Sequence, residues 1–300
     1  DSPQAVGFQP AIPPHATAAH MRTARRSDGS HVQPRRRARG ASRVVSNVLI
    51  SLGLVLIVAA AVMLVRAQMQ YKAQDEVNAT QQAHAIVTDD ANTAPVVDWE
   101  GLRAMGGDPI GWIQVPGTVV NYPVYQGVDN DQYLRHTVTG EYSIGGQIFM
   151  DYENTKPGLV DAQTVIYGHH LNNGGMFAAI DDFCDQSFFD QHGTVWYVTE
   201  QASYQLVPIL IYRTRGDDTT GRTIDFSSSD EFHSYLSGLL GKAAASDARA
   251  ADVVSRAQRV LTLSTCDYDV AGVSTSIGGR ALLVCVPLED YQAAVAATQS

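Results

Sequence analysis

The feature that most constrains this chain is an uncharged apolar run near its N-terminus, residues 44–65, with the sequence VVSNVLISLGLVLIVAAAVMLV. At a rise of about 1.5 Å per residue, a helix of this length spans about 33 Å, enough to cross a hydrocarbon core of about 30 Å. Arg43 and Arg66 mark its two ends. The apolar region of a cleaved signal peptide is shorter, about 7–15 residues. The run therefore predicts an uncleaved transmembrane anchor.

Charge is distributed unevenly on the two sides of this run. Residues 1–43 contain eight arginines and two aspartates, a net charge of +6, whereas the whole chain carries −10, so residues 44–300 carry −16. Because basic residues favour the cytoplasmic side of a membrane helix, we expect a cytoplasmic N-terminus and an extracellular body. Five prolines and no apolar period in residues 1–43 predict a disordered basic tail. An acidic body argues against nucleic acid as a partner.

Beyond the anchor, the composition predicts two further parts. Residues 66–97 are rich in Ala, Gln, Asp, Asn and Thr, which indicates a partly helical stalk or linker. Residues 98–300 contain eight short β-rich runs separated by Gly, Pro, Asn and Asp, and these predict a mainly β domain, a closed eight-stranded barrel with peripheral helices. The expected strands are residues 111–115, 118–122, 146–150, 164–167, 194–198, 204–212, 259–264 and 280–287.

Helices are expected between these strands and at both ends of the domain. The longest, near residues 230–240, places Phe232, Leu236 and Leu239 on one face. An aspartate at the N-cap position predicts a helix that begins at Asp98. The full set of expected helices is residues 98–105, 130–134, 176–180, 230–240 and 289–297.

Three scattered cysteines are too few for a disulfide framework, and no Cys/His spacing indicates a zinc site. Cys285 lies in a continuous apolar run, which predicts a buried and inert thiol. Cys184 has acidic neighbours, which disfavour the thiolate. Cys266 follows a predicted strand and precedes polar residues, where a rigid scaffold can present a reactive group. Elimination therefore leaves Cys266 as the candidate nucleophile.

A cysteine nucleophile needs a base or a cation nearby. Five histidines of the body are available: His136, His169, His170, His192 and His233. His169 follows the predicted strand 164–167 and Gly168, which permits a sharp turn. A single histidine is more often a surface or capping residue, so this context alone leaves the choice among the five open.

The order of several motifs resembles the sortase family and, within it, class B. VIYGHH (165–170), MF (176–177), LTLSTC (261–266) and Arg280 at the start of a terminal strand carry the resemblance. GWIQVP (111–116), NYPV (121–124), DNDQYL (129–134) and GGQIFMD (145–151) resemble the segments that precede the histidine in that class. The likeness extends from about residue 98 to 288.

The resemblance implies a cysteine transpeptidase with a sortase-like barrel, and it implies a role for each of three residues. Cys266 would be the nucleophile, His169 the general acid and base, and Arg280 the group that stabilises the substrate and the oxyanion. The implied partners are the sorting-signal peptide of a secreted protein and an amine of a cell-wall precursor or a pilin lysine; no metal or cofactor is needed. The loop after His169 and residues 213–226 are expected to shape the peptide groove.

Several alternatives remain at this stage. A pilin-polymerising sortase would use the same residues with another acceptor. A papain-like protease would place its cysteine before its histidine, whereas His169 precedes Cys266 by 97 residues. An L,D-transpeptidase would show a Ser-x-Gly-Cys pattern, which is not found around Cys266. A membrane-tethered binding module without catalysis would use its thiols only structurally.

Overall fold

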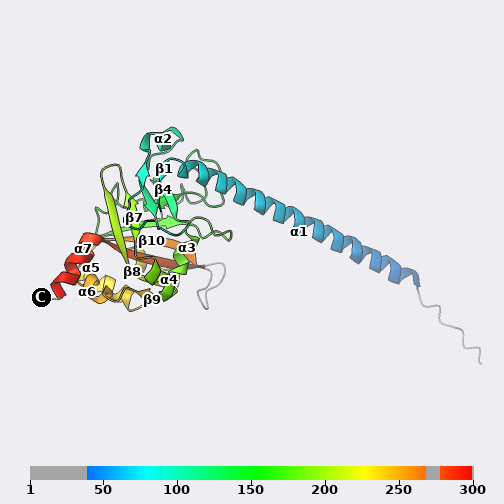
Figure 1. Cartoon of the computed structure of the whole chain (residues 1–300). Coiled ribbons are helices and arrows are strands. Elements are labelled where there is room, and N and C mark those ends of the chain that lie inside the picture. The colour runs from blue at the N-terminus through cyan, green and yellow to red at the C-terminus, as the bar shows by residue number, and fades with distance from the viewer. Residues whose placement is uncertain (1–38, 89, 268–277, 299–300) are drawn as a thin grey trace, which may run out of the picture. The chain divides into compact units, whose positions relative to one another are not determined.

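The structure is a computed structural model, and it describes residues 39–88, 90–267 and 278–298, with the backbone alone at residues 39–42, 266 and 267. By its internal contacts the chain divides into two compact units, residues 1–58 and residues 59–300. Each unit is described by itself. The secondary-structure elements carry the labels of Figure 1.

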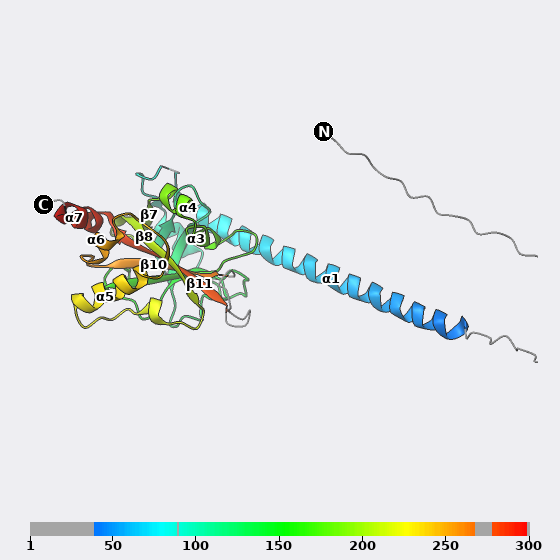
Figure 2. The same cartoon turned by 90° about the horizontal axis from the view of Figure 1, so that it is seen from below.

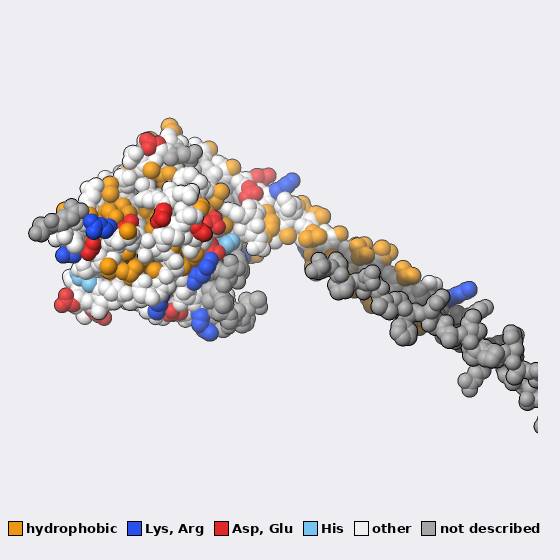
Figure 3. All heavy atoms as spheres, turned by 60° about the horizontal axis from the view of Figure 1, so that its bottom comes forward, with side chains coloured by type: hydrophobic (Ala, Val, Ile, Leu, Met, Phe, Trp, Pro, Cys, Tyr) orange, Lys and Arg blue, Asp and Glu red, His pale blue; other side chains and the backbone are white. Residues whose placement is uncertain are grey.

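The first element is one long helix, α1 (Arg39–Gln82), which contains the whole apolar run. The run has no proline and only one glycine, and its Val, Ile, Leu and Ala side chains are exposed along the helix (Figure 3). Its most apolar window has a mean hydropathy of 3.1 and is not buried by the protein. By length and composition, α1 is therefore the one helix among the described residues that could span a membrane.

The last turns of α1 contact the domain that follows, through side-chain amides. Gln74, Asn78 and Gln81 are buried there. Gln74 donates to Asn78 Oδ1 at 2.9 Å, and its Oε1 accepts from the backbone N–H of Gly145 at 3.1 Å. Gln81 donates to Gln147 Oε1 at 2.9 Å. The polar composition that predicts a stalk thus contains a hydrogen-bonded contact face over these three residues.

Eight strands form the closed barrel that the sequence predicts. The order is β11-β10-β6-β5-β4-β3-β7-β8, and the pairing of β8 with β11 closes the ring (Figures 1 and 2). The β4–β5 and β6–β10 pairs are parallel and the other pairs are antiparallel. The strands are β3 (Pro109–Gln114), β4 (Asn121–Gln126), β5 (Ile148–Met150), β6 (Gln163–Gly168), β7 (Val195–Val198), β8 (Ser203–Arg215), β10 (Val260–Asp267) and β11 (Gly279–Pro287).

Three short strands lie outside this ring and were not predicted from the sequence. β9 (Ala243–Ser246) extends the sheet by pairing with β8. β1 (Ala85–Ile86) and β2 (Val96–Val97) pair only with each other. All three are short, and β9 consists of small residues, so none has the alternation of large apolar side chains that identifies a strand.

Two of the expected elements differ in the structure. The strand expected at residues 118–122 begins only at Asn121, because residues 115–120 form a turn in which the N–H of Thr118 donates to Val115 O at 3.1 Å. The helix expected at residues 130–134 is wrong. Asp129 Oδ1 there accepts from the backbone N–H groups of residues 131 and 132 at 3.0 and 2.8 Å. Contacts of this kind occur at helix starts as well as in turns, and here the segment forms only a turn, in which the N–H of Leu134 donates to Asp131 O at 3.2 Å.

The remaining helices lie around the barrel. The predicted helices near residues 98–105, 230–240 and 289–297 are confirmed as α2 (Trp99–Ala104), α5 (Ser229–Leu240) and α7 (Leu288–Thr298). Asp98 caps α2 by accepting from the Gly101 N–H at 3.0 Å, as predicted. The helix expected at residues 176–180 lies two residues later, as α3 (Ala178–Asp182). α4 (Gln186–Gln191) and α6 (Ala250–Val254) were not predicted.

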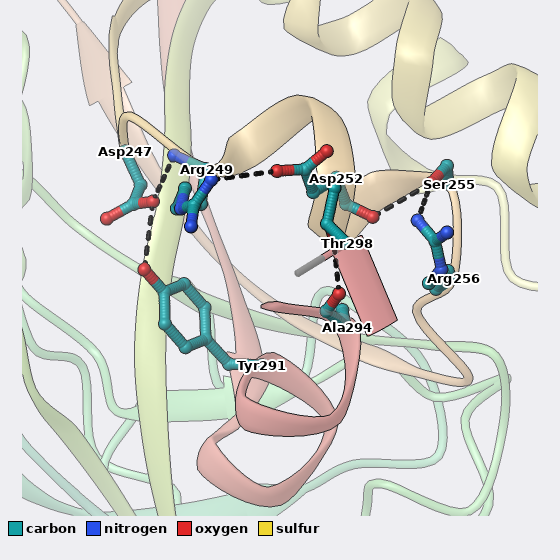
Figure 4. Close-up of polar contacts among 8 residues, drawn as sticks. All are labelled: Asp247, Arg249, Asp252, Ser255, Arg256, Tyr291, Ala294 and Thr298. Carbon is teal, nitrogen blue, oxygen red and sulfur yellow. Dashed lines mark hydrogen bonds and ion pairs between the residues drawn. The ribbon is translucent and has the colours of Figure 1, made fainter. Parts of the chain in front are cut away.

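Among the described residues the domain has two large hydrophobic cores, one inside the barrel and a second outside it, and two smaller buried clusters. The second core lies between helices α5, α6 and α7 and the outward side chains of β8 and β11. The predicted face of α5, residues Phe232, Leu236 and Leu239, is buried in it. Figure 4 shows how α7 is held there: Tyr291 donates to Asp247 Oδ1 at 3.1 Å, and the N–H of Arg249 donates to the same oxygen at 2.6 Å.

Candidate active site

Three neighbouring strands bring the predicted site residues to one end of the barrel. β6 and β10 are parallel, so both end at the same edge of the sheet, and the register pairs Gly168 with Thr265. β11 runs antiparallel to β10 and begins at that edge, where the backbone of Arg280 pairs with that of Cys266. His169 directly follows the last residue of β6. The chain positions of all three predicted site residues therefore lie on adjacent strand ends.

Gly168 fits the end of β6 for a different reason from the expected turn. Its φ does not lie in the left-handed region. A Cβ at this position would lie 2.5 Å from the Phe177 ring and 2.6 Å from the Ile148 side chain, closer than real Cβ contacts allow. Glycine is therefore required by close packing, and this packing fixes the strand end that leads into His169.

His169 is held through its ring and through its backbone. Its Nε2 lies 2.7 Å from the carbonyl oxygen of Leu134 and donates to it, and its own carbonyl accepts from the Phe177 N–H at 2.8 Å. Burial lowers the pKa of His169 below its usual 6.5, and the charges of Arg135 and Arg280 act in the same direction, while the Leu134 hydrogen bond opposes them. A hydrogen bond on Nε2 leaves Nδ1 as the ring nitrogen able to exchange a proton.

The structure also shows the environments of Cys285 and Cys184, and that of Cys285 agrees with the sequence analysis. Cys285 is fully buried in the barrel core, and burial raises the pKa of its thiol far above the usual value, so this thiol is inert. Cys184 is half-buried after α3, with its Sγ 3.9 Å from Asp181 Oδ1. For Cys266 the structure describes the backbone, within β10.

A cavity of about 330 Å³ opens at these strand ends. It is lined by His169, Arg280 and Thr265, the residue before Cys266, together with groups that the sequence analysis did not single out. Those groups come from the β4–β5 connection, from β5 and β6, from the end of β10, and from the connection between β8 and α5: Asn130, Asp131, Leu134, Arg135, Phe149, Tyr167, Gly168, Arg222 and Ser264. Arg222, from residues 213–226, lines this cavity, and the expectation that these residues shape the peptide groove stays a prediction.

Arg280 lies half-buried at the start of β11 and faces this cavity. Its Nη1 donates to the carbonyl of Gly279 at 3.2 Å. It lines the same cavity as His169, and its charge contributes to lowering the pKa of that imidazole. A guanidinium beside a strand end can hold a carbonyl oxygen or an oxyanion with fixed N–H donors.

A hydrogen-bonded carboxylate lies behind the cavity wall. Asp151 is buried, and its Oδ2 accepts from the Tyr167 hydroxyl at 2.6 Å and from Asn130 Nδ2 at 3.0 Å. These bonds connect β6 to the β4–β5 connection, which also carries the Leu134 carbonyl. Asp151 therefore joins β6, which leads into His169, to the connection whose Leu134 carbonyl accepts from the His169 ring.

Comparison with known proteins agrees with this architecture. The model of the Sortase domain matches residues 113–280. Sortase B of Listeria monocytogenes is 33% identical over 193 residues, which cover 62% of this chain and 76% of that protein. Sortase B of Staphylococcus aureus is 34% identical over 170 residues, covering 56% and 67%. The X-ray structure of Clostridium perfringens sortase B is 31% identical, with a TM-score of 0.57, covering 64% of this chain and 100% of that one.

The family match extends over more than half of the chain, and the chain therefore belongs to the sortase family. Sortases are cysteine transpeptidases, so this chain is an enzyme of that type. Among sortases it is similar to class B, because the curated relatives and the solved structures described above are sortase B proteins.

Proposed function

We propose that this enzyme cleaves the C-terminal sorting motif of secreted proteins and joins them to an amine of a cell-wall precursor. The observation that supports this proposal is the cavity at the ends of β6, β10 and β11, to which His169 and Arg280 contribute and beside which Cys266 stands in sequence. Cys266 acts as the nucleophile, His169 as the general acid and base, and Arg280 as the oxyanion-stabilising group.

The first half-reaction forms an acyl-enzyme. The Cys266 thiolate attacks the carbonyl carbon of the residue before the scissile bond, and negative charge develops on the carbonyl oxygen beside Arg280. One such fixed donor is worth about 2.7–4 kcal/mol to a transition state. The C–N bond then breaks as protonated His169 gives its proton to the leaving amine. Because burial lowers its pKa, His169 in its charged form is a stronger acid than a free imidazolium.

The second half-reaction transfers the acyl group. A neutral amine attacks the thioester, neutral His169 accepts the proton of that amine, and the Cys266 thiolate leaves. The new amide bond joins the sorted protein to the acceptor, and His169 returns to its charged form. Water could replace the amine in this step, so the ratio of amide product to hydrolysed product measures transpeptidation directly.

We further propose that residues 44–65 anchor the enzyme in the cell membrane, with residues 1–43 in the cytoplasm and residues 98–300 outside the cell. The apolar part of α1 and the +6 charge of residues 1–43 support this orientation. A sorting enzyme of this topology would meet its substrates as they emerge from the membrane.

The test uses the full chain in detergent with a library of sorting peptides and several amine acceptors, read by mass spectrometry. We expect a covalent adduct on Cys266 and an amide product, both lost in Cys266→Ala and reduced at least 100-fold in His169→Ala. Cys184→Ala is the matched control and should retain product formation. If no peptide gives a Cys266 acyl-enzyme or an amide product, the proposed function is wrong.

A further inference from the structure

Arg222 is a cation of the cavity to which the catalytic roles above assign no task. It ends the short 3₁₀ helix η1 (Thr220–Arg222), within the connection from β8 to α5. Its side chain is half-buried and lines the same cavity as His169 and Arg280. A guanidinium at the wall of a substrate cavity is either a solvated charge on a loose loop or a fixed binding group. The attachment of its backbone decides between these two.

The backbone on both sides of Arg222 is bonded to a buried amide. Gln163, at the start of β6, is fully buried, and its Nε2 donates to Gly221 O at 3.1 Å and to Thr223 O at 2.9 Å. The amide itself is held from β10, because Thr262 donates to Gln163 Oε1 at 3.0 Å. Two carbonyls that flank Arg222 are therefore tied to the barrel.

Packing restricts the same segment further. A Cβ on Gly221 would run into the hydroxyl of Tyr212, so only glycine lets the chain pass so close to β8. Tight packing beside Arg222 and hydrogen bonds on either side leave its backbone little freedom. Because the backbone is already ordered, only the side chain of Arg222 has to be ordered when it binds a ligand.

The surroundings of Arg222 lack a negative partner within the described structure. Arg222 and Tyr167 line the same cavity, and the charge of Arg222 opposes the rise that burial and Asp151 cause in the pKa of Tyr167. Asp151, behind that hydroxyl, already accepts from Tyr167 and Asn130. Among the described residues, no carboxylate forms an ion pair with Arg222.

The described lining of the cavity has the opposite sign to the body. Among the described residues, this lining contains Arg135, Arg222 and Arg280 and one carboxylate, Asp131. Residues 44–300 carry a net charge of −16. A positive hollow in an acidic surface attracts negative groups and concentrates them at one place.

We propose that Arg222 is a specificity-determining residue that binds a carboxylate of a substrate, in addition to the catalytic groups. This inference rests on the proposed function, because it assumes that the cavity holds the sorting peptide and then the acceptor. The carboxylate can come from an acidic side chain of the sorting peptide or from a carboxylate near the acceptor amine. Arginine binds either carboxylate through two parallel hydrogen bonds. The isosteric carboxamide of the ligand, Asn for Asp or Gln for Glu, has no negative charge to pair with the guanidinium.

The first arm of the test measures the acylation half-reaction in the full chain in detergent. Sorting peptides are compared in pairs that differ by Asp against Asn or Glu against Gln at one position. If the carboxylate belongs to the sorting peptide, the acidic member of one pair has a kcat/KM about 10- to 100-fold higher. Arg222→Gln reduces this ratio to about one, and Arg222→Glu makes the enzyme prefer Lys over Gln at that position.

The second arm measures the transfer half-reaction from one fixed acyl donor. Acceptor amines with a neighbouring carboxylate are compared with the corresponding carboxamides. If the carboxylate belongs to the acceptor, the same Arg222-dependent ratio appears here and not in the first arm. Arg215→Gln is the matched control in both arms. Arg215 ends β8 just before this connection, is exposed and pairs with Asp217 at 2.9 Å, so its replacement should leave both ratios unchanged.

The outcomes separate this inference from the function on which it rests. If acyl-enzyme and amide form but neither ratio depends on Arg222, the assignment of Arg222 is wrong and the proposed function stands. A ratio that changes equally in Arg215→Gln would indicate a general charge effect and would also overturn the assignment. If no acyl-enzyme forms with any peptide, both proposals fail together.

Discussion

His169 is held by groups that come from two different connections of the barrel. The Leu134 carbonyl accepts from the ring Nε2, and Phe177 donates to the backbone carbonyl of His169. Burial and, to a smaller extent, neighbouring arginines favour its neutral form. The proposed mechanism needs this residue to change charge twice in each cycle, so its pKa affects catalysis. Because the pKa differs between the folded and unfolded states, it also affects the stability of the fold.

The stability of the fold should depend on pH through His169. The pKa of His169 is lower in the folded state than the usual 6.5, mainly because of burial. Between these two pKa values the unfolded chain binds more protons, so the free energy of unfolding rises with pH. The contribution of His169 is therefore fully present above about pH 6.5 and is lost as the pH falls through the folded pKa. When the pH is lowered from 7.5 to 5, the free energy of unfolding measured in urea should fall less in His169→Gln than in the wild type.

The control for this measurement is His136→Gln, which removes an exposed imidazole. It should keep the wild-type dependence of the unfolding free energy on pH. An unchanged pH dependence in His169→Gln would contradict the role of burial at this site.

The sequence indicates candidate side chains better than it indicates their backbone partners. Cys266, His169 and Arg280 are predicted from their residue types, their positions at predicted strand ends and the order of the motifs, and their roles stay a prediction. The Leu134 carbonyl could not be found in this way, because every residue has a carbonyl and its direction depends on the fold. Arg222 lies within residues 213–226, which the sequence predicts to shape the groove. Its selection from that range needs the Gln163 hydrogen bonds, which join residues 58 and 60 positions apart.

The elements of the barrel follow from local pattern, whereas their pairing does not. All eight predicted strands are present because each combines apolar runs with flanking turn residues. The parallel register of β6 and β10 brings Gly168 beside Thr265, and such long-range pairing has no local signal. The helix expected at residues 130–134 is absent although Asp129 accepts two backbone N–H groups there, as the first residue of a helix would. Because the same contacts also occur in turns, the local sequence does not distinguish the two structures.

The side-chain amide of Gln74 should stabilise the contact between α1 and the barrel. Gln74 Oε1 accepts from the Gly145 N–H and from the Ser143 hydroxyl, and all three residues are buried. Gln74→Leu would leave these donors without an acceptor, at a cost of about 1–3 kcal/mol. We expect a lower Tm, by about 2–4 °C per kcal/mol for a unit of this size. Differential scanning calorimetry of the full chain in detergent measures this change.

The comparison variant is Gln68→Leu, which makes the same replacement at an exposed position of the same helix. It should change the free energy of unfolding by less than about 0.5 kcal/mol. Equal Tm values for the two variants would mean that the amide contacts of α1 do not stabilise the barrel.

For the molecule as a whole, the uneven charge and the apolar run both bear on where the active site works. A basic tail of +6 precedes an apolar run of membrane-spanning length, and an acidic domain follows it. The free energy of placing charged residues across a membrane favours retention of the arginines in the cytoplasm. The same proposed orientation would bring Cys266, the proposed nucleophile, to the outer surface, where the proposed substrates are.

This orientation can be tested with single reporter cysteines in living cells. In a Cys184→Ala and Cys266→Ala background, Cys285 remains but is fully buried, so it should not react with a maleimide. Ser237→Cys, at an exposed position of α5, should react with a membrane-impermeant maleimide in intact cells. Ser27→Cys, in the basic tail, should react only after the membrane is permeabilised.

The arginines before the apolar run should determine the orientation of the protein in the membrane. If their charge sets the orientation, replacing Arg35, Arg36, Arg37 and Arg39 by alanine should expose Ser27→Cys in some molecules of intact cells. It should lower the labelling of Ser237→Cys by the same fraction, because one helix cannot place both reporters outside. Labelling of Ser27→Cys in intact cells with all arginines present would refute the proposed topology. The proposed chemistry at Cys266 could then still be assayed in detergent, because acyl transfer by the purified enzyme does not depend on which side of the membrane it faces.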